Sequence, residues 1–499
     1  MACAKPLPAI LVFIFSIFLQ ASGQNSRPRE IFPFNTPEQQ GISSRTLDSL
    51  LLFIKETNQN IHHLTIIRND HTVIDADFYP YSSHNLHDLA SVTKSITALL
   101  IGIAIDRKFI RDENQLVLTF FPEVVSHDSL RYALRVKDLV TMTSGFACGT
   151  VDGERALSDM RKTDDWVKFI FDLPMISKPG ETFSYCSCNF YLLAEIIFRA
   201  AHMTPHEFAK KYLFEPLEID HSIWLSNYKN INHGWGDLFL YPADMDKIGK
   251  LMLDSGRWQN RQIVSREWVA KCLKTYSRLN DEKGYGYGWW TYEKGGFYEA
   301  AGRGRQTISI IPSRHMIVTM LGGEFDAGTI GKYIFQSIKS NQPLPENKNA
   351  YAELKNLMKE VAVVPPVREK MLMNDTLVKA LNGRFIVFEK NISGIDSLIF
   401  HFTLSTGGTV IFFRGKNKEE HPFLLSAKKY AISMDNTPGL PVALQAEFSS
   451  HSEFILHYNQ LCRINNFYFR FTVHNENILT HMEETSNFIK TDIAGSFSK

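Results

Sequence analysis

Apolar positions follow two different spacings along the chain. After Ser91 they recur at helical spacing, at Ile96, Leu99, Leu100, Ile103 and Ile105, and the sequence predicts a long apolar helix there with Asp88 as its N-cap. Further helices are predicted at 164–172, 190–200, 244–254 and 265–273. Apolar and polar residues alternate at 63–68 and 72–78, around the turn Asn69-Asp70, and again at 306–311 and 316–321. Strands at both ends with helices between them indicate an α+β domain.

The last third of the chain has a different pattern. A chain of 499 residues is too long for one ordinary core, so two domains are expected. The composition changes near 342–347, a charged helix follows, and Val363-Val-Pro-Pro-Val reads as a stiff linker. Six β-rich runs come after Leu377: 383–388, 397–404, 409–414, 443–448, 452–458 and 466–473. We therefore predict a first domain at 24–345, a linker at 346–376, and a small antiparallel β-rich domain at 377–499 that carries no recognisable catalytic motif.

The first 23 residues have the pattern of a cleaved secretory signal. Lys5 supplies a positive charge, positions 10–19 are apolar, and Ala21-Ser22-Gly23 offers small residues before a cut at Gln24. The alternative is an N-terminal membrane anchor, although the apolar run is short for a span. No other stretch is long and apolar enough to cross a bilayer. The sequence predicts an exported protein, secreted or, if its source is bacterial, periplasmic.

The charge balance limits the kinds of binding partner, and the cysteine count limits the disulfides that the chain can form. The chain carries 54 basic and 53 acidic residues, a balance that favours neither nucleic acid nor an anionic membrane as a partner. After signal removal five of the 6 cysteines remain, so at least one stays unpaired within the chain. They are Cys148, Cys186, Cys188, Cys272 and Cys462. The pair Cys186-Ser-Cys188 is a poor metal motif. The oligomeric state stays open.

Ser91 and Lys94 are the strongest candidates for chemistry. Ser91-Val-Thr-Lys94 opens the predicted apolar helix, which places a hydroxyl and an amine one turn apart on the same face. A serine hydroxyl is a poor nucleophile until a neighbouring base takes its proton, and an amine at this spacing can assist. The same short pattern recurs at Ser226 and Ser426, but neither of these opens a long apolar helix.

Two further segments supply partners for this serine. In Pro179-Gly-Glu-Thr-Phe-Ser-Tyr185-Cys-Ser187, the tyrosine can act as a base if a nearby ammonium such as that of Lys94 stabilises its phenolate, and Ser187 can add a hydrogen bond. In Gly302-Arg-Gly304-Arg305, glycines before a strand permit a close approach of backbone to ligand. The backbone N–H of Arg305 is predicted to form an oxyanion hole with that of Ser91.

These motifs carry a family resemblance. The chain resembles the serine β-lactamase/penicillin-binding-protein superfamily, on the class C β-lactamase-like side with its esterases and aminohexanoate-oligomer hydrolases. The matching blocks run in the family's order between about 33 and 340: Ser91-Val-Thr-Lys94, Leu139-Val-Thr-Met-Thr-Ser-Gly145, Asp172-Leu-Pro-Met, Pro179-Gly-Glu-Thr-Phe-Ser-Tyr185-Cys-Ser187, Leu192-Leu193, Gly236-Asp-Leu-Phe-Leu-Tyr-Pro-Ala-Asp-Met245, Gly256-Arg-Trp and Tyr285-Gly-Tyr-Gly-Trp-Trp290.

The resemblance implies a fold and a mechanism. It implies an antiparallel sheet flanked by a helical lobe, with the site between them. It also implies that Ser91 is acylated, that water then hydrolyses the acyl-enzyme, that Lys94 relays a proton and that Tyr185 is the base. No metal or organic cofactor is needed for this chemistry. The implied partner is a small-molecule ester or amide substrate.

Two departures from the family pattern bear on the substrate. The family's Tyr-x-Asn is Tyr185-Cys186-Ser187 here, and Gly302-Arg303-Gly304 replaces the Lys-Thr-Gly of true β-lactamases. Both changes favour an esterase or amidase over a β-lactamase or peptidoglycan DD-peptidase. A catalytically silent module that binds a peptide or glycan on the same fold is the other alternative.

Two structural hypotheses accompany these predictions. Cys148 and Cys186 are proposed to form a disulfide that fixes Tyr185, the alternative being two buried thiols. Trp235, Trp289 and Trp290 are candidates to line an acyl pocket, although large aromatic residues more often pack in a core.

Overall fold

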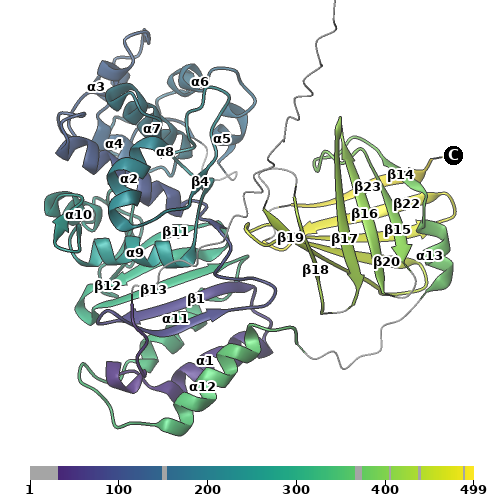
Figure 1. Ribbon diagram of the computed structural model, residues 1–499. Coiled ribbons are helices and arrows are strands. Elements are labelled where there is room, and N and C mark those ends of the chain that lie inside the picture. The colour runs from purple at the N-terminus through teal and green to yellow at the C-terminus, as the bar shows by residue number, and fades with distance from the viewer. Residues whose placement is uncertain are drawn as a thin grey trace, which may run out of the picture.

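The computed structural model describes residues 32–148, 154–365, 374–403, 406–426, 428–435, 440–486 and 489–498. The predicted signal segment 1–23 lies outside these residues. The described chain forms an N-terminal α+β domain and a C-terminal β domain, as the sequence pattern predicts (Figure 1). Within the described residues, no helix has the length and apolar character needed to span a bilayer.

An eight-stranded antiparallel sheet is the centre of the N-terminal domain. Its strand order is β2-β1-β13-β12-β11-β10-β9-β8. The predicted strands near 63–68, 72–78, 306–311 and 316–321 are confirmed as β1, β2, β12 and β13. In sheet order the bounds are β2 (His71–Asp77), β1 (Ile61–Arg68), β13 (Met316–Gly322), β12 (Gln306–Ile311), β11 (Phe297–Gly302), β10 (Trp290–Tyr292), β9 (Gly284–Tyr285) and β8 (Ser277–Arg278). Short strands lie outside this sheet: β3 (His87–Asp88), β4 (Ile223–Trp224), β5 (Leu238–Leu240), β6 (Arg257–Trp258) and β7 (Arg261–Gln262).

Helices cover both faces of this sheet (Figure 1). One face packs against α1 (Ser44–Glu56), α11 (Ala327–Ser337) and α12 (Lys348–Val361). The other packs against α2 (Val92–Asp106) and α9 (Pro242–Leu253), with the helical lobe beyond them. That lobe contains α3 (Leu130–Ala133), α4 (Val136–Val140), α5 (Arg155–Met160), α6 (Trp166–Asp172), α7 (Ser187–Ala201) and α8 (Pro205–Ala209), and α10 (Arg266–Cys272) packs beside α2.

Helix α12 changes the expected domain boundary. It lies within the segment 346–376 that the sequence pattern assigns to a linker. Its apolar residues Leu354 and Leu357 are buried against α1 and the sheet, so the helix belongs to the N-terminal domain. Helix α13 (Asp375–Leu381), at the other end of that segment, packs on the C-terminal domain through Leu377 and Leu381.

Helix α2 is the core helix of the domain. Every residue from Val92 to Ala104 is buried, because the helix is apolar on all sides and contacts α7, α10 and the sheet. Asp88 is not its N-cap, contrary to the prediction. The helix starts directly after Ser91, and the Asp88 carboxylate instead accepts the N–H of Ala90 at 2.8 Å. The reason is a tight turn before the helix, in which Ala90 adopts a left-handed conformation with φ of 45°.

The C-terminal domain is a closed β-barrel. Its ten-stranded sheet has the order β17-β16-β15-β14-β23-β22-β21-β20-β19-β18, and a parallel pairing of β17 with β19 closes nine of the strands. The bounds are β14 (Phe385–Phe388), β15 (Ser397–Thr403), β16 (Gly407–Arg414), β17 (Asn417–Leu425), β18 (Ala431–Met434), β19 (Pro441–Phe448), β20 (Glu453–Gln460), β21 (Asn466–His474), β22 (Asn477–Glu484) and β23 (Lys490–Phe497). Six of these were predicted. Strand β17 escaped prediction because its first half is polar and exposed.

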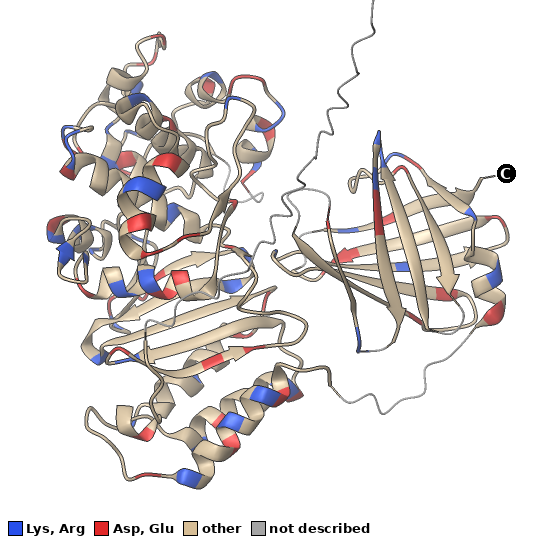
Figure 2. Cartoon of the chain, viewed as in Figure 1, with Lys and Arg blue, Asp and Glu red and all other residues tan. Residues whose placement is uncertain are grey.

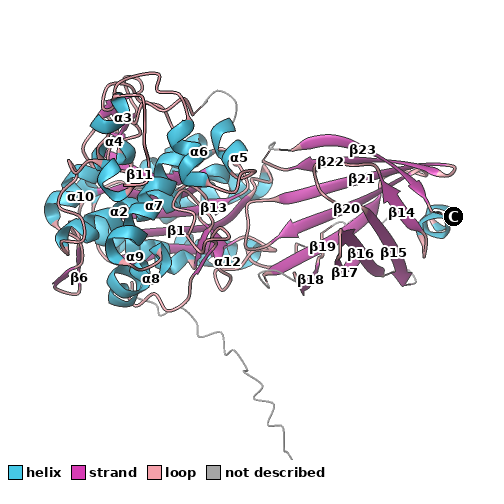
Figure 3. Ribbon diagram, turned by 90° about the horizontal axis from the view of Figure 1, so that it is seen from above, coloured by secondary structure: helices cyan, strands magenta, loops and turns pink. Residues whose placement is uncertain are grey.

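The barrel docks on the N-terminal domain through the β20–β21 loop. The Asp88 N–H donates to the carbonyl of Cys462 at 2.8 Å, and the Asn466 side-chain amide donates to the hydroxyl of Tyr81 at 2.5 Å. Leu440 and Cys462 are buried against Phe239. Figure 3 shows strands of the barrel running toward the N-terminal domain. The contact places the barrel beside the turn that carries Ser91.

Candidate active site

Ser91 lies in the turn between β3 and α2. The turn is tight: the N–H of Val92 donates to the carbonyl of Leu89 at 3.0 Å, and that of Lys94 to the carbonyl of Ser91 at 3.0 Å. The side chain is partly exposed, whereas the helix that follows is buried. The local sequence therefore presents one hydroxyl at the end of a rigid core helix.

Lys94 points from the first turn of α2 toward this hydroxyl. Its Nζ donates to the Oγ of Ser91 at 2.8 Å and to the backbone carbonyl of Trp235 at 3.1 Å. The residue is only 1% exposed. A buried amine that is held by a backbone carbonyl and directed at a serine hydroxyl is arranged for proton transfer rather than for solvation.

Tyr185 lies beside Lys94, two residues before α7. The Nζ of Lys94 is 4.9 Å from the centroid of the tyrosine ring. The ring stacks on Trp290, with centroids 5.9 Å apart and planes 8° apart. The structure thus brings Ser91, Lys94 and Tyr185 together at the N-terminal ends of α2 and α7.

A disulfide fixes the residue next to Tyr185. Cys148 and Cys186 are bonded, which confirms the predicted pairing. Cys188 is a buried free thiol whose sulfur lies within 4.8 Å of the other two, and burial raises its pKa to about 12. Because the disulfide occupies two of these three sulfurs, the cluster as it stands offers a metal ion a single thiol.

Ser187 is engaged by a carboxylate that sequence reasoning missed. Its hydroxyl donates to the Glu154 carboxylate at 2.7 Å, and its backbone N–H donates to the same group at 3.2 Å. Glu154 is 33 residues away in sequence, and no motif surrounds it. The position that holds a carboxamide in the family pattern is therefore part of a serine–carboxylate pair here.

Gly302, at the end of β11, lies against Ser91. A Cβ added to Gly302 would stand 2.9 Å from the Ser91 amide nitrogen and 2.8 Å from the Leu89 carbonyl oxygen. Gly304, with φ of 73°, packs instead against Ile464 of the barrel. Arg305 is also left-handed, with φ of 69°, and its guanidinium pairs with Glu324 at 3.1 Å.

Arg303 turns toward the barrel. Its guanidinium donates to the Ser486 hydroxyl at 2.8 Å and to the Asn465 side-chain oxygen at 3.1 Å, and it pairs with Glu484 at 3.4 Å. Glu484 is fully buried. In the family pattern, a lysine near this position binds a substrate carboxylate. Arg303 is the cationic residue nearest to that position in sequence, and the C-terminal domain holds its side chain.

Asp88 connects the serine turn with this interface. Burial and, next, the nearby Asp237 raise the pKa of its carboxyl to about 6. The guanidinium groups of Arg463 and Arg303 act in the opposite direction. Arg463 lies on the barrel and Arg303 just after β11, so both domains contribute charge to the turn before Ser91.

The three tryptophans proposed as pocket lining differ in position. Trp289 has no exposed surface and Trp235 is 6% exposed, so both pack in the core. Trp290 is partly exposed and lies between Tyr185 and Lys283, whose Nζ is 3.8 Å from the indole centroid. Burial lowers the pKa of Lys283. Of the three, Trp290 is the one placed to contact a substrate.

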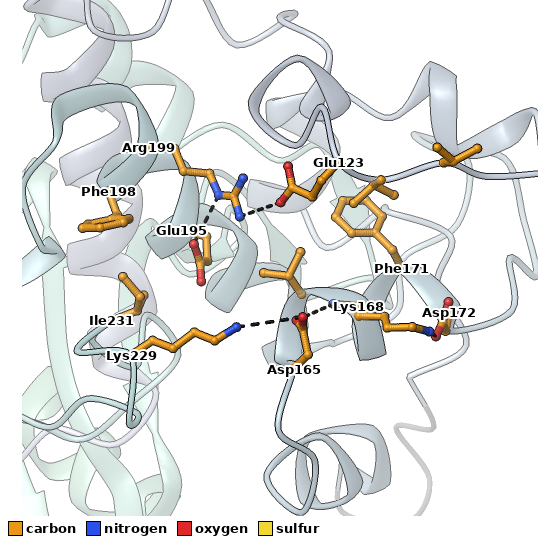
Figure 4. Close-up of a pocket in the computed structure, with 13 residues that line it drawn as sticks. Glu123, Asp165, Lys168, Phe171, Asp172, Glu195, Phe198, Arg199, Lys229 and Ile231 are labelled. Carbon is orange, nitrogen blue, oxygen red and sulfur yellow. Dashed lines mark hydrogen bonds and ion pairs between the residues drawn. The ribbon is translucent and has the colours of Figure 1, made fainter.

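A separate cavity of about 790 Å³ lies in the helical lobe (Figure 4). Arg199 pairs with Glu123 at 2.8 Å and with Glu195 at 3.3 Å, and Lys229 pairs with Asp165 at 3.9 Å. None of the catalytic candidates lines it. The acidic and basic side chains of this cavity pair with one another. Figure 2 shows that acidic and basic residues are also mixed elsewhere on both domains.

Comparison with known proteins agrees with this arrangement. The 6-aminohexanoate-dimer hydrolase of Paenarthrobacter ureafaciens is 26% identical over 223 residues, which cover 42% of this chain and 56% of that protein. Protein flp of Staphylococcus aureus (strain MW2) is 23% identical over 146 residues, 29% of each protein. The chain thus matches little more than half the length of the first relative and less of the second.

Solved structures of hydrolases share the fold. A family VIII carboxylesterase superposes with a TM-score of 0.50 at 14% identity, over 62% of this chain and 99% of the esterase. EstCE1, a hydrolase with promiscuous acyltransferase activity, gives 0.50 at 12% identity, over 60% of this chain and 99% of its own. The Beta-lactamase family model matches residues 63–327, more than half of the chain and the whole of the segment that carries Ser91, Lys94 and Tyr185. The chain therefore belongs to the Beta-lactamase family.

Proposed function

We propose that this protein is a serine hydrolase that cleaves an ester or amide bond through an acyl-enzyme on Ser91. The observation that carries the proposal is the 2.8 Å hydrogen bond between the buried Lys94 amine and the Ser91 hydroxyl. Tyr185, beside the same amine, supplies a second group that can hold a proton. The relatives named as hydrolases support the reaction class.

The proposed reaction has two halves. In acylation the Ser91 Oγ bonds to the substrate carbonyl carbon, and its proton passes through Lys94 to Tyr185. The bond to the leaving alcohol or amine then breaks, and that group takes the proton from Tyr185. In deacylation a water molecule attacks the acyl carbon and Tyr185 accepts the water's proton. The bond between the acyl carbon and the Ser91 oxygen then breaks, and this oxygen takes the proton back from Tyr185 through Lys94.

The oxyanion of each tetrahedral intermediate needs backbone donors. The N–H of Ser91, at the start of α2, is one candidate. Gly302 lies against this N–H, so we place the second donor at the end of β11 rather than at Arg305. A pair of such donors contributes several kcal/mol to transition-state stabilisation, about 3 kcal/mol for each one removed.

The site favours an ester or simple amide over a β-lactam. Arg303 is bound by Glu484, Ser486 and Asn465, so it is not directed at a substrate carboxylate. Ser187 bonds to Glu154 in place of a carboxamide that would hold a substrate amide. Both observations weigh against a β-lactamase or DD-peptidase.

Labelling with a fluorophosphonate tests the nucleophile directly. Intact-mass measurement of the wild-type chain is expected to show one adduct, which Ser91→Ala abolishes and the chance match Ser226→Ala retains. Lys94→Met, which keeps an apolar stem of similar length, is expected to slow labelling by about 10²–10⁴-fold. A folded wild type that takes no adduct would support the silent binding module instead.

Substrate turnover then separates the enzyme classes. Hydrolysis of short-chain nitrophenyl esters without nitrocefin turnover is expected. Nitrocefin turnover at a comparable kcat/KM would overturn the ester or amide proposal in favour of the β-lactamase alternative.

We also propose that the chain is exported after removal of residues 1–23. The Cys148–Cys186 disulfide supports this, because such bonds persist in oxidising compartments. Expression in a secreting host followed by N-terminal sequencing should give Gln24 as the first residue of the released protein. Retention of the uncleaved chain in the membrane fraction would favour an anchor.

A further inference from the structure

The C-terminal barrel encloses a cavity of about 350 Å³. Its apolar wall includes Phe412, Phe469 and Met482, each no more than 5% exposed, and the ring of Tyr458. Three of these side chains come from the neighbouring strands β20, β21 and β22, and Phe412 comes from β16, which is not adjacent to them in the sheet. The cavity is therefore interior space of the barrel and not a surface groove.

Aromatic rings fill the other half of the barrel interior. Phe400 packs edge-on against Phe423, Phe454 and Phe471, with ring centroids 5.2–6.0 Å apart. Phe402 and Phe448 extend the same cluster. A nine-stranded barrel has more interior than small side chains fill, and here the aromatic residues fill one end and leave the other open.

The open end has a polar rim. Arg414 forms an ion pair with Glu419, and the Asp435 carboxylate accepts the N–H of Leu440 at 2.8 Å. Ile392, also at the rim, is 67% exposed. The Tyr458 hydroxyl and the Gln460 amide add polar groups near the same end.

Arg463 also lines the cavity, and its charge acts on the carboxyl groups of Asp88 and Asp237 in the N-terminal domain. Its guanidinium lies 5.3 Å from the ring centroid of Phe239 and the residue is partly buried. A partly buried guanidinium at the mouth of an apolar cavity is a binding group for an anion.

We propose that the barrel cavity binds a free carboxylic acid with an apolar chain, which lies against Phe412, Phe469 and Met482 while its carboxylate pairs with Arg463. The volume equals that of about a dozen waters at about 30 Å³ each, so it suits a chain of about that many heavy atoms. The positive charge of Arg463 selects a carboxylate over a cationic head group. The cavity is separate from the Ser91 site, because Ser91, Lys94 and Tyr185 do not line it.

Calorimetric titration of the full chain carrying Ser91→Ala tests the proposal with three ligands of one chain length. Decanoate is expected to bind with one site per chain. Decanol, without the charge, and decyltrimethylammonium, with the opposite charge, are expected to bind at least tenfold more weakly. Equal affinity for all three, or no binding of decanoate, would overturn the proposal.

Variants locate the site. Ile489→Trp, which enlarges a rim residue toward the cavity, should weaken decanoate binding at least tenfold, whereas Leu479→Trp on the outer face of β22 should leave it unchanged. Arg463→Gln should remove the preference for decanoate over decanol, and Arg463→Lys should restore part of it. Decanoate binding that survives both Ile489→Trp and Arg463→Gln would place the acid elsewhere on the chain and reject this cavity.

Discussion

Arg303, just after strand β11 of the N-terminal domain, pairs with Glu484 of the barrel at 3.4 Å, and the glutamate has no exposed surface. The pair joins the segment beside Ser91 to the C-terminal domain. Asn465 and Ser486 complete the surroundings of the two charges. The barrel thus holds the side chain of Arg303, the residue that follows Gly302.

Loss of Glu484 should weaken this junction. Glu484→Ala leaves the guanidinium of Arg303, one third exposed, without its buried partner, and is expected to lower the free energy of unfolding by about 1–3 kcal/mol. Urea denaturation checks the value. The neighbouring Glu483→Ala is the matched control, because Glu483 pairs with Lys490 at the surface and should cost at most about 1 kcal/mol. Equal effects of the two variants would show that the buried pair adds nothing.

Gly302→Ala should inactivate the enzyme while the domain stays folded. The new methyl group would stand 2.9 Å from the Ser91 amide nitrogen, where an oxyanion has to bind. A fall in kcat of about 10²–10³-fold is expected, the effect of losing one oxyanion donor. Gly331→Ala is the control, since a Cβ there meets nothing within 4 Å. Full ester turnover by folded Gly302→Ala would move the oxyanion site away from β11.

Tyr185→Phe should slow turnover far more than it changes stability. The phenylalanine ring can keep the stack on Trp290, so only the hydroxyl is lost. We expect kcat to fall by about 10²–10⁴-fold, the usual contribution of a general base. Ester hydrolysis followed from pH 5 to 10, together with thermal unfolding, separates the two effects. Unchanged activity across that range would exclude Tyr185 as the base.

The Cys148–Cys186 disulfide should contribute both stability and activity. Its loop spans 38 residues, for which about 2–4 kcal/mol is typical, and Cys186 follows Tyr185 directly. The double variant Cys148→Ala/Cys186→Ala is expected to unfold at a lower temperature and to turn over ester more slowly. Cys188→Ala keeps the bond and serves as the control. A double variant as active as the control would mean that the bond does not position Tyr185.

The domain interface should be sensitive to acid. His62 and His87 are buried with ring nitrogens 2.9 Å apart, and His62 stacks on Tyr81, which accepts a hydrogen bond from Asn466 of the barrel. Burial lowers the pKa of His87 from 6.5 to about 4, and that of His62 well below its usual value.

The sign of the effect follows from proton uptake. Between pH 6.5 and about 4 the unfolded chain binds protons that the folded histidines do not, so stability is lost as the pH falls through this window. Denaturation midpoints from pH 4 to 8 should show the loss, and His87→Asn should reduce it. The exposed neighbour His84→Asn should not. The same slope in all three proteins would assign the acid lability to other groups.

The sequence by itself determined the local features of the site. The apolar run after Ser91 predicts a buried helix, and helical spacing then places Lys94 next to the serine without any tertiary information. Alternation of apolar and polar residues gave the strands of both domains, since a half-buried strand imposes a period of two. The pattern predicted the charged helix α12 but assigned it to the linker, and it missed β17 because the first half of that strand is polar and exposed.

Only the tertiary structure determined which residues surround Ser91 and Lys94. The Glu154–Ser187 bond and the Arg303–Glu484 pair each join residues that lie far apart in sequence, 33 positions in the first case and 181 in the second. Local propensity and spacing carry no information about such pairs, because they depend on how whole elements pack. For the same reason, the sequence could not predict the approach of Gly302 to Ser91 or the cavity of the barrel. Both depend on how the sheets fold in three dimensions.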